Sequence, residues 1–451
     1  MTYRPRWTLL LCSLLLSLAM TVSACGGGDG DKGAGNADPG ADKTAAPAAS
    51  DVSGEVSITA VWSGPEQEAF EAVLEGFKKS NPGVTTSYNS GGDQLVTVLS
   101  TAVEGGNPPD LAVLAQPGLA QDFAKKGALK PIDYASDALT ENFAEDWIKL
   151  GNFDGKQYGV PFKGANKSTV WHNVQAFEDA GIEPAATFDE FLENAATLKE
   201  SGVPAFSIAG ADGWTLTDLF ENLYLRMAGP EKYDQLAKHE IPWTDESVKQ
   251  TLTEMGKVFA DEENIAGGNR GALQVDFPKS VSQVFSESPK AAIVIEGDFV
   301  AGVIADSTKA KPGEGYDVSP FPAVGDSSEN TVVGGGDMVV AFSDTPAVQA
   351  LVKYLATAEA AEIWAKRGGF ASPNKNLDPS VYPDDITRKT ASALAEAEVF
   401  RFDMSDLAPA DFGGTPGRGE WKILQDFLRD SKDIAGTTKA LEKAAAKAFK
   451  S

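Results

Sequence analysis

Short apolar segments with two different periods alternate along the first folded part of this chain. Apolar residues recur at every second position in 56–62, and they recur at helical spacing in 65–79. Further segments with strand, helix and strand character follow at 84–88, 95–102 and 111–114. Because parallel neighbours need a long crossover connection, this order predicts a parallel sheet with helices packed on its faces.

The second half of the chain repeats this alternation. β-branched and apolar residues predict strands at 168–172, 204–208 and 291–295. Thr187 and Glu190 have the spacing of a capping box that opens a helix. Since about 400 residues belong to this folded part, two domains are expected rather than one core.

The first 25 residues have the pattern of an export signal. Basic residues precede an apolar run at 7–20, which is shorter than the roughly 20 residues that span a bilayer. Small residues at 22–24 lead to Cys25, and this end resembles the lipobox of bacterial lipoproteins. We therefore expect residues 1–24 to be removed as a lipoprotein signal peptide and Cys25 to carry a lipid. An ordinary signal peptide cut near a cysteine is the alternative.

Composition limits the partners of the mature chain. Residues 25–54 are almost entirely small or polar, so we expect a flexible tether. A formal net charge of −26 argues against nucleic acid, because phosphates need a basic face. The only cysteines are Cys12 and Cys25, so no disulfide is expected after cleavage. His172 and His239 lack metal-binding companions, and we expect neither a metal nor a cofactor.

Aromatic and polar residues follow several predicted strands. Ligands of open parallel sheets bind beyond the carboxyl ends of the strands. Trp62 and Gln116 lie at such positions, as do Trp214 and Glu296. Trp62 could instead continue the buried face of its strand. Trp214 could be a hydrophobic staple against Leu219, so these alternatives stay open.

Three glycines and an aspartate at 334–337 precede a predicted strand at 338–342. Glycines permit close approaches that other residues forbid. A phosphate cradle is disfavoured, because no Gly-Lys-Ser/Thr follows and Asp337 puts a negative charge where a phosphate would lie.

Four motifs follow one another in a fixed order. They are Gly-Gly-Asn-Pro-Pro-Asp-Leu at 105–111, Gly-Lys-Gln-Tyr-Gly-Val-Pro at 155–161, Lys-Ala-Ala-Ile-Val-Ile-Glu-Gly at 290–297 and Gly-Tyr-Asp-Val-Ser-Pro-Phe-Pro at 315–322. In this order they resemble the extracellular solute-binding proteins of carbohydrate ABC transporters, the cluster that includes maltose-binding proteins. Within that cluster, the α-glucoside-binding branch is most similar at 167–171, 228–234 and 240–245.

The resemblance covers nearly all of 56–421 and implies a two-lobed α/β fold of the type II periplasmic-binding-protein kind. Each lobe would be a mostly parallel sheet flanked by helices, with the ligand cleft between the lobes. The implied boundaries are 55–162 plus 336–369 for lobe 1 and 166–332 plus 373–451 for lobe 2. The implied chain crossings lie near 161–165, 333–336 and 369–373.

The residue pattern and the resemblance together give a candidate sugar site. A pyranose has apolar faces that stack on aromatic rings, and its hydroxyls need hydrogen-bond partners. Lys163 and Lys167 could instead neutralise neighbouring acids. The family often has an aromatic residue directly after Gly297, where this chain has Asp298 and then Phe299, so the ring there stays open. The candidates are Trp62, Gln116, Lys163, Asn166, Trp214, Asp218, Glu296, Gly335, Asp337 and Phe370.

By this resemblance the chain is a sugar-binding component of an ABC importer, anchored by lipid to the outer face of the bacterial cytoplasmic membrane. It would capture a di- or oligosaccharide, expected to be an α-glucoside, by closure of its lobes, and deliver it to the permease subunits. We expect a monomer and no enzyme activity. The alternatives are a binding protein for another carbohydrate, a surface adhesin, or an exported glycoside-acting enzyme with Glu296 and Asp337 as its carboxylate pair.

Overall fold

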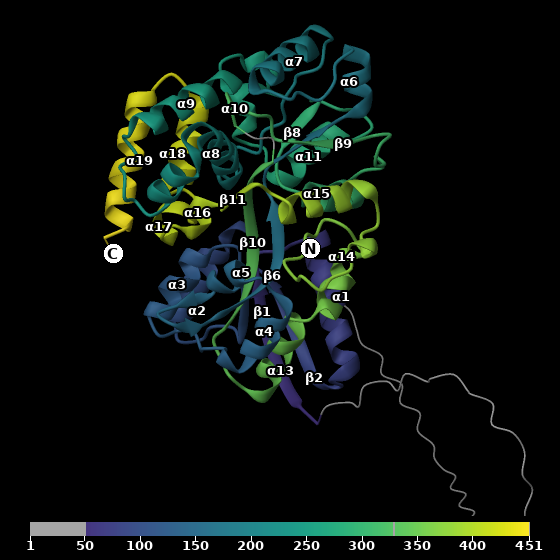
Figure 1. Ribbon diagram of the computed structural model, residues 1–451, viewed down its shortest axis with the longest axis vertical. Helices are drawn as coiled ribbons and strands as arrows, with labels where there is room; N and C mark the ends of the chain where they lie inside the picture. The colour runs from purple at the N-terminus through teal and green to yellow at the C-terminus, as the bar shows by residue number, and fades with distance from the viewer. Residues whose placement is uncertain (1–50, 328–329, 451) are drawn as a thin grey trace, which may run out of the picture. The chain divides into compact units, whose positions relative to one another are not determined.

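The computed structural model describes residues 51–327 and 330–450 (Figure 1). The predicted signal peptide, Cys25 and most of the predicted tether lie outside the described residues. The first strand begins at Ser53, so residues 53 and 54, predicted to end the tether, belong to the sheet. Within the described residues, no helix combines the length and the apolar character that a membrane crossing requires.

Lobe 1, the lower lobe in Figure 1, contains the strands predicted at the start of the folded part. β1 (Ser53–Ala60) pairs in parallel with β2 (Gly83–Ser90) and with β3 (Leu111–Leu114), as predicted. β10 (Thr331–Ala341) joins the other side of β3 and runs antiparallel to it. The core of lobe 1 therefore surrounds a mixed sheet whose first three strands are parallel.

The helices of lobe 1 follow the predicted spacing with one difference. α1 (Pro65–Ser80) buries its predicted apolar face. In α2 (Leu95–Glu104) helical spacing predicts that Val98 shares a buried face with Leu95 and Leu99, but Val98 is 45% exposed and Val96 is buried instead. The face of α2 that carries Val96 packs on β3 and β10, and this contact sets the rotation of the helix. The other helices of this lobe are α3 (Pro117–Lys125), α4 (Ser136–Asn142), α5 (Glu145–Lys149), α13 (Pro346–Leu355) and α14 (Ala358–Ala365).

Lobe 2, the upper lobe in Figure 1, has a smaller sheet in the order β8-β7-β9. β7 (Thr169–His172) lies between β8 (Ile293–Ile295) and β9 (Asp317–Pro320), and it is antiparallel to both. This corrects the prediction of a mostly parallel sheet in each lobe. β8 and β9 run in one direction, but the reversed strand β7 separates them.

The segment 204–208, predicted as a strand, does not form one. Phe206 forms isolated bridges with Ile265 and Ile293 only. Pro204 has no N–H to donate to a neighbouring strand, which shortens the possible ladder. The segment therefore lies beside the sheet of lobe 2 with too few paired residues to form a strand.

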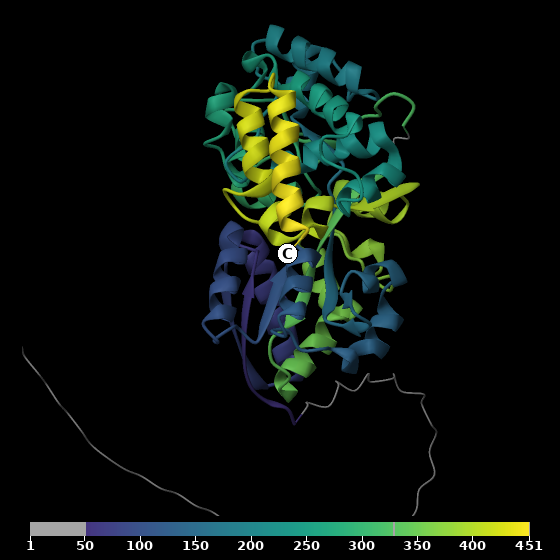
Figure 2. The same cartoon turned by 90° about the vertical axis from the view of Figure 1, so that its left-hand side faces the viewer.

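The remaining helices surround the sheet of lobe 2 and the junction of the lobes. α7 (Phe188–Glu200) opens with the predicted capping box, in which the Thr187 hydroxyl accepts the Glu190 N–H and the Glu190 carboxylate accepts the Thr187 N–H. Figure 2 shows α18 and α19 in yellow over the upper lobe. The others are α6 (Val174–Ala180), α8 (Trp214–Ala237), α9 (Glu246–Phe259), α10 (Gly268–Ala272), α11 (Phe277–Phe285), α12 (Val300–Ser307), α15 (Asp385–Ala395), α16 (Met404–Leu407), α17 (Ala410–Gly413), α18 (Gly419–Arg429) and α19 (Ile434–Ala448).

Two long strands run side by side through the junction of the lobes (Figure 1). β6 (Gly159–Asn166) is antiparallel to β10, and Gly164 of β6 also forms a bridge with Ala371. The three segments where crossings were expected are thus neighbours, while the lobe boundaries themselves stay a prediction. Three further strands complete the set: β4 (Asn152–Phe153), β5 (Lys156–Gln157) and β11 (Val399–Phe402).

Candidate ligand-binding cleft

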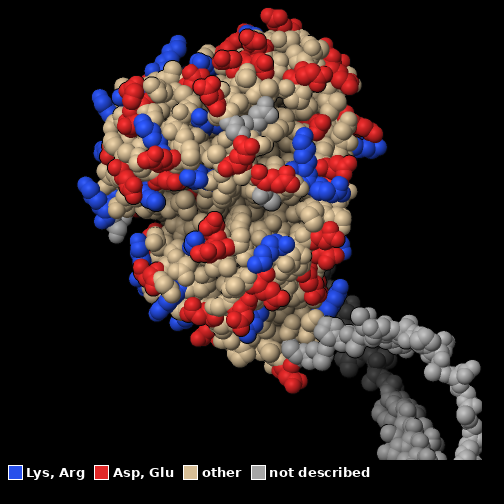
Figure 3. Space-filling model, in the orientation of Figure 1, with Lys and Arg blue, Asp and Glu red and all other residues tan. Residues whose placement is uncertain are grey.

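A cleft of about 560 Å³ is lined by residues of both lobes. The space-filling view also shows a furrow between the lobes (Figure 3). Lobe 1 contributes the loop after β1, the turn before α2 and the start of α3. Lobe 2 contributes the starts of α8 and α11 and the segment before α12. The cleft therefore lies beyond strand ends and beside helix starts, as expected for an α/β ligand site.

The structure brings half of the ten predicted residues to this cleft. Those that line it are Trp62, Gln116, Lys163, Trp214 and Asp337. The cleft lining does not include Asn166, Asp218, Glu296, Gly335 or Phe370.

Trp62 combines the two roles that the sequence left open. Its side chain is only 2% exposed and packs against Phe70 and Trp364, with ring centroids 4.9 and 4.7 Å away. Its indole N–H donates to Asp337 Oδ2 over 2.9 Å. Trp62 is therefore mainly a core residue that fixes a cleft carboxylate.

Trp214 belongs to a group of three aromatic rings in lobe 2. Its ring centroid lies 5.4 Å from that of Phe277 and 5.9 Å from that of Phe299. All three residues line the cleft. Phe299 therefore supplies the aromatic ring that the sequence left open after Gly297, and Phe277 and Phe299 are the close ring partners of Trp214. We call Trp214, Phe277 and Phe299 the aromatic wall.

Phe370 was predicted as a cleft ring, but it lies in the core of lobe 1. It is 1% exposed, and its ring stacks on Trp364 at 5.2 Å. Gly368 and Gly369, both with positive φ, precede it. Only glycine adopts such angles readily, and this turn places the ring on the core instead of the cleft.

Two other candidates, Asn166 and Gly335, have structural roles near the crossing strands. The Asn166 side chain accepts the Ser168 N–H and donates to the Thr390 carbonyl, so its polar groups are already used. A Cβ on Gly335 would lie 2.7 Å from Lys167 Cε, which shows that this glycine makes room for the lysine. Its neighbour Gly336 lines the cleft instead.

Lys163 is held in a cluster at the cleft that we call the Lys163 centre, comprising Lys163, Glu66 and Asp337. Its ammonium pairs with Glu66 and lies 5.4 Å from the Trp364 ring and 5.5 Å from the Phe299 ring. Burial lowers the pKa of Lys163, but Glu66 and Asp337 outweigh burial, and the pKa is raised. Lys163 therefore stays charged while it contacts rings of both lobes.

Lys167 is the middle of a second cluster, the Lys167 centre, with Asp218, Asp403 and Asp406. Its Nζ lies 3.2 Å from Asp218 Oδ1, 2.5 Å from Asp403 Oδ2 and 3.3 Å from Asp406 Oδ2. Burial raises the pKa of Asp403, but the Lys167 charge and hydrogen bond reverse this and hold it at about 2. Asp218 is therefore an ion-pair partner of a buried lysine. Lys167 neutralises neighbouring acids, which is one of the two roles that the sequence left open for it.

Glu296 lies behind the cleft, beside Asp218. It is 3% exposed and borders a separate cavity of about 20 Å³. Burial and the neighbouring Asp218 raise its pKa well above the ordinary value. The structure does not bring Glu296 and Asp337 together in the cleft, so the carboxylate pair of the glycosidase alternative is not formed there.

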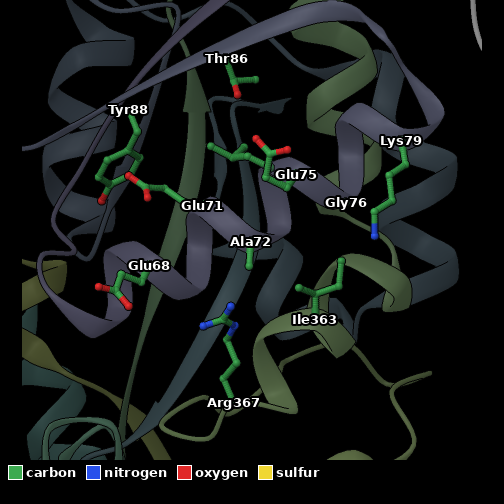
Figure 4. Close-up of a pocket in the computed structure, with 11 residues that line it drawn as sticks. Glu68, Glu71, Ala72, Glu75, Gly76, Lys79, Thr86, Tyr88, Ile363 and Arg367 are labelled. Atoms are coloured by element: carbon green, nitrogen blue, oxygen red, sulfur yellow. The ribbon is translucent and has the colours of Figure 1, made fainter. Parts of the chain in front are cut away.

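A larger hollow of about 660 Å³ lies elsewhere on lobe 1, between α1, β2 and α14 (Figure 4). Charged residues dominate its walls, with Glu68, Glu71 and Glu75 on α1 and Arg367 after α14. Tyr88 is its one aromatic lining residue among those described. This hollow has no ring wall on which a sugar could stack, so the interlobe cleft is the better candidate site.

Sequence reasoning missed several cleft residues. Asp93, Asp212, Asp276 and Trp421 line the cleft but were not among the candidates. Phe277 could have been found, because Asp276 and Pro278 around it have the pattern of a helix start, where ligands often bind.

The fold and cleft are those of a two-lobed binding protein, and comparison with known proteins agrees. The family model of bacterial extracellular solute-binding proteins matches residues 62–362. The chain belongs to this family, in the group that serves carbohydrate ABC transporters. It is therefore an exported binding protein and not an enzyme.

Two characterised relatives match most of the chain. It is 34% identical over 381 residues to the osmoprotective compounds-binding protein GgtB of Synechocystis sp., covering 83% of this chain and 88% of the relative. It is 33% identical over 403 residues to the alpha-glucosides-binding periplasmic protein AglE of Rhizobium meliloti, covering 85% and 86%.

Solved structures share the fold at lower identity. The solute receptor AcbH, described as exclusive for β-D-galactopyranose, has a TM-score of 0.77 at 22% identity, with 88% of this chain and 99% of AcbH covered. A chitin oligosaccharide binding protein has a TM-score of 0.76 at 20% identity, with 88% and 100% covered. These likenesses concern the fold alone.

Proposed function

We propose that this protein captures an α-linked glucoside of two or more sugar units and delivers it to the permease of an ABC importer. The observation that carries the proposal is the cleft between the lobes, where an aromatic wall faces buried polar groups. A volume of about 560 Å³ falls within the roughly 300–1,000 Å³ of small-molecule sites. The α-glucoside assignment is supported by the similarity to AglE over most of both chains.

The cleft offers aromatic rings on one side and polar groups on the other, and a sugar can use both. The aromatic wall offers ring faces to the apolar side of a pyranose. Gln116, Asp337 and Lys163 offer donors and acceptors for hydroxyls from the lobe 1 side and from the crossing strand. A ligand that contacts both sets stabilises the closed arrangement by its greater affinity for that state.

Contacts between the lobes also support closure. Asp93 of lobe 1 and Trp214 of lobe 2 line the same cleft. Burial raises the pKa of Asp93, and the Trp214 side chain opposes this rise. Lys163 contacts the Phe299 ring of lobe 2 while it pairs with Glu66 of lobe 1. Closure would therefore bring the aromatic wall onto a ligand that already rests on lobe 1.

The test is a thermal-shift and calorimetric screen of the mature chain with the α-glucosides maltose, trehalose, sucrose and maltotriose and with the β-linked sugars cellobiose and lactose. We expect the largest rise in melting temperature from an α-linked glucoside. Trp214→Ala should remove most of that rise, whereas Tyr158→Ala, a partly buried ring outside the cleft, should preserve it. A shift confined to β-linked sugars would refute the α-glucoside proposal.

We further propose that Cys25 carries the lipid anchor and that the protein acts as a monomer. The amino-terminal pattern supports the anchor, and the completeness of the cleft within one chain supports the monomer. Mass spectrometry of the membrane-extracted protein should find a lipidated Cys25. An unmodified amino terminus would refute the anchor, and light scattering at twice the monomer mass would refute the monomer.

A further inference from the structure

The basic side chains of the cleft are already committed to protein carboxylates. Among the described lining residues, Lys163 and Lys167 are the only basic ones, and each is held within its own centre. Four other lining acids belong to neither centre: Asp93, Asp212, Asp276 and Asp306. The free charge that the cleft presents to a ligand is therefore negative.

Asp93, Asp212 and Asp276 line the same cleft from its two sides, and we call them the aspartate trio. Asp93 lies in the turn before α2 in lobe 1, whereas Asp212 precedes α8 and Asp276 precedes α11 in lobe 2. Burial raises the pKa of Asp212 to about 7, with further contributions from Asp93 and Asp276 and opposition from the Phe277 N–H. No lysine or arginine of the described chain forms an ion pair with the trio. The cleft thus gathers like charges from both lobes without a counter-charge from the described protein.

The aromatic wall borders the aspartate trio. The Phe277 N–H donates to Asp212 Oδ2 over 2.6 Å, Phe277 directly follows Asp276, and Trp214 lines the cleft together with Asp93. Carboxylates beside ring faces match the chemistry of an organic cation, which gains from the negative charges and from the π faces. Among the described residues, no group of three His, Cys, Asp or Glu is arranged to hold a metal ion. The geometry thus favours an ammonium group over a metal.

A separate residue indicates that the ligand also carries hydroxyls. Trp421 of α18 lines the same cleft and is only 4% exposed. Its indole N–H is buried and has no acceptor in the described protein. A buried donor without an acceptor is costly, and a hydroxyl oxygen of a ligand would satisfy it.

We propose that the cleft prefers a glycoside that bears an ammonium group, which the aspartate trio holds against the aromatic wall, and that it excludes glycosides with a negative charge. This inference rests on the proposed function and names the ligand class more closely. The committed state of Lys163 and Lys167 gives the exclusion, because an incoming anion would meet uncompensated carboxylates.

The test uses calorimetry on matched sets of ligands. Trehalose, maltose and sucrose are each compared with their monoamino derivatives and with their monophosphates. We expect at least one amine to bind about tenfold more tightly than its neutral parent, because a new charge pair forms in a partly desolvated site. The phosphates should show no measurable binding. If no amine exceeds its parent, or if a phosphate binds as well as its parent, the inference is wrong.

Two variants separate this inference from the proposed function. Asp212→Asn should abolish the preference for the amine, measured as the ratio of the affinity for the amine to the affinity for its neutral parent. Asp306→Asn removes an exposed acid from the same cleft and should keep the preference. Neutral glucosides that bind without any gain from an amine would overturn this inference and leave the proposed function standing. Absence of binding by every member of all three sets would overturn both.

Discussion

The lysines of the Lys163 centre and the Lys167 centre lie four residues apart in the chain, but their carboxylate partners differ in exposure. Both bury a lysine among carboxylates near the crossing strands. The partner of Lys163, Glu66, keeps a side-chain exposure of 30%, and the Lys163 ammonium also contacts rings of both lobes. The partners of Lys167 are at most 7% exposed and come from α8 and α16.

A buried lysine among carboxylates can therefore contribute to ligand binding at one site and to the stability of the fold at another. Lys163 keeps its charge paired with Glu66, but it lines the cleft, so the remaining N–H groups of its ammonium can donate to a ligand hydroxyl. Lys167 has three carboxylate partners and joins segments that are distant in sequence. We therefore expect changes at Lys167 to affect folding and changes at Lys163 to affect binding more.

The largest expected effect is that of Lys167→Met. The substitution leaves Asp218, Asp403 and Asp406 buried together without a cation, so the free energy of unfolding should fall by about 3–5 kcal/mol. Urea unfolding followed by circular dichroism measures this. A loss below about 1 kcal/mol would mean that the Lys167 centre is not structural.

The next effect is a pH dependence that originates beside the Lys163 centre. Burial raises the pKa of Asp298 to about 7, against opposition from the Asn166 N–H and Lys163. A raised carboxyl pKa means that the folded state holds the proton longer than the unfolded chain. Stability should therefore fall as pH rises from about 4 to about 7, by about 2–3 kcal/mol between pH 5 and pH 8.

Unfolding of Asp298→Asn at pH 5 and pH 8 checks the origin of this slope. The variant should lose much of the difference, because its amide does not titrate. An unchanged slope would assign the effect to other buried acids, such as those of the Lys167 centre.

Lys163→Met should have a smaller effect on stability, about 1–2 kcal/mol, because Glu66 can turn towards water. The affinity for the best glucoside should fall about tenfold, which corresponds to about 1.4 kcal/mol. Calorimetry beside urea unfolding separates the two losses. If affinity is retained while stability falls as far as in Lys167→Met, the contrast between the centres fails.

The smallest expected effect is that of an exposed lysine pair. Lys422 and Asp426 pair on the surface of α18, with side-chain exposures of 43% and 48%. Lys422→Met should change the free energy of unfolding by no more than about 0.5 kcal/mol. This variant gives the baseline against which both buried centres are compared. A larger loss would show that removal of any lysine weakens this acidic protein.

Local pattern predicted the first strands and helices well. In β1 and α1 the apolar spacing reflects contacts with the nearest layer, which the sequence shows directly. The antiparallel sheet of lobe 2 was not predictable in this way. Alternation identifies a strand, but the direction of β7 relative to β8 depends on pairing over more than a hundred residues.

The candidate site shows the same difference between local pattern, which the sequence reveals, and long-range contacts, which it does not. Trp62 and Gln116 were found because they end or follow strands of the first sheet. Asp93 and Asp212 were missed because their importance arises only when two lobes face each other. Phe370 failed because two glycines with positive φ turn it into the core, a backbone detail that aromatic character does not reveal.

The pairing of β6 with β10 has a consequence for how this chain can change its length. The register shifts between Asp337 and Met338, which lie opposite Lys163 and Pro161. Because side chains alternate along a strand, loss of one residue in β10 would turn Asp337 away from Trp62 and Lys163. Insertions and deletions are therefore tolerated in the outer loops but not in β6 and β10, whose register depends on their number of residues.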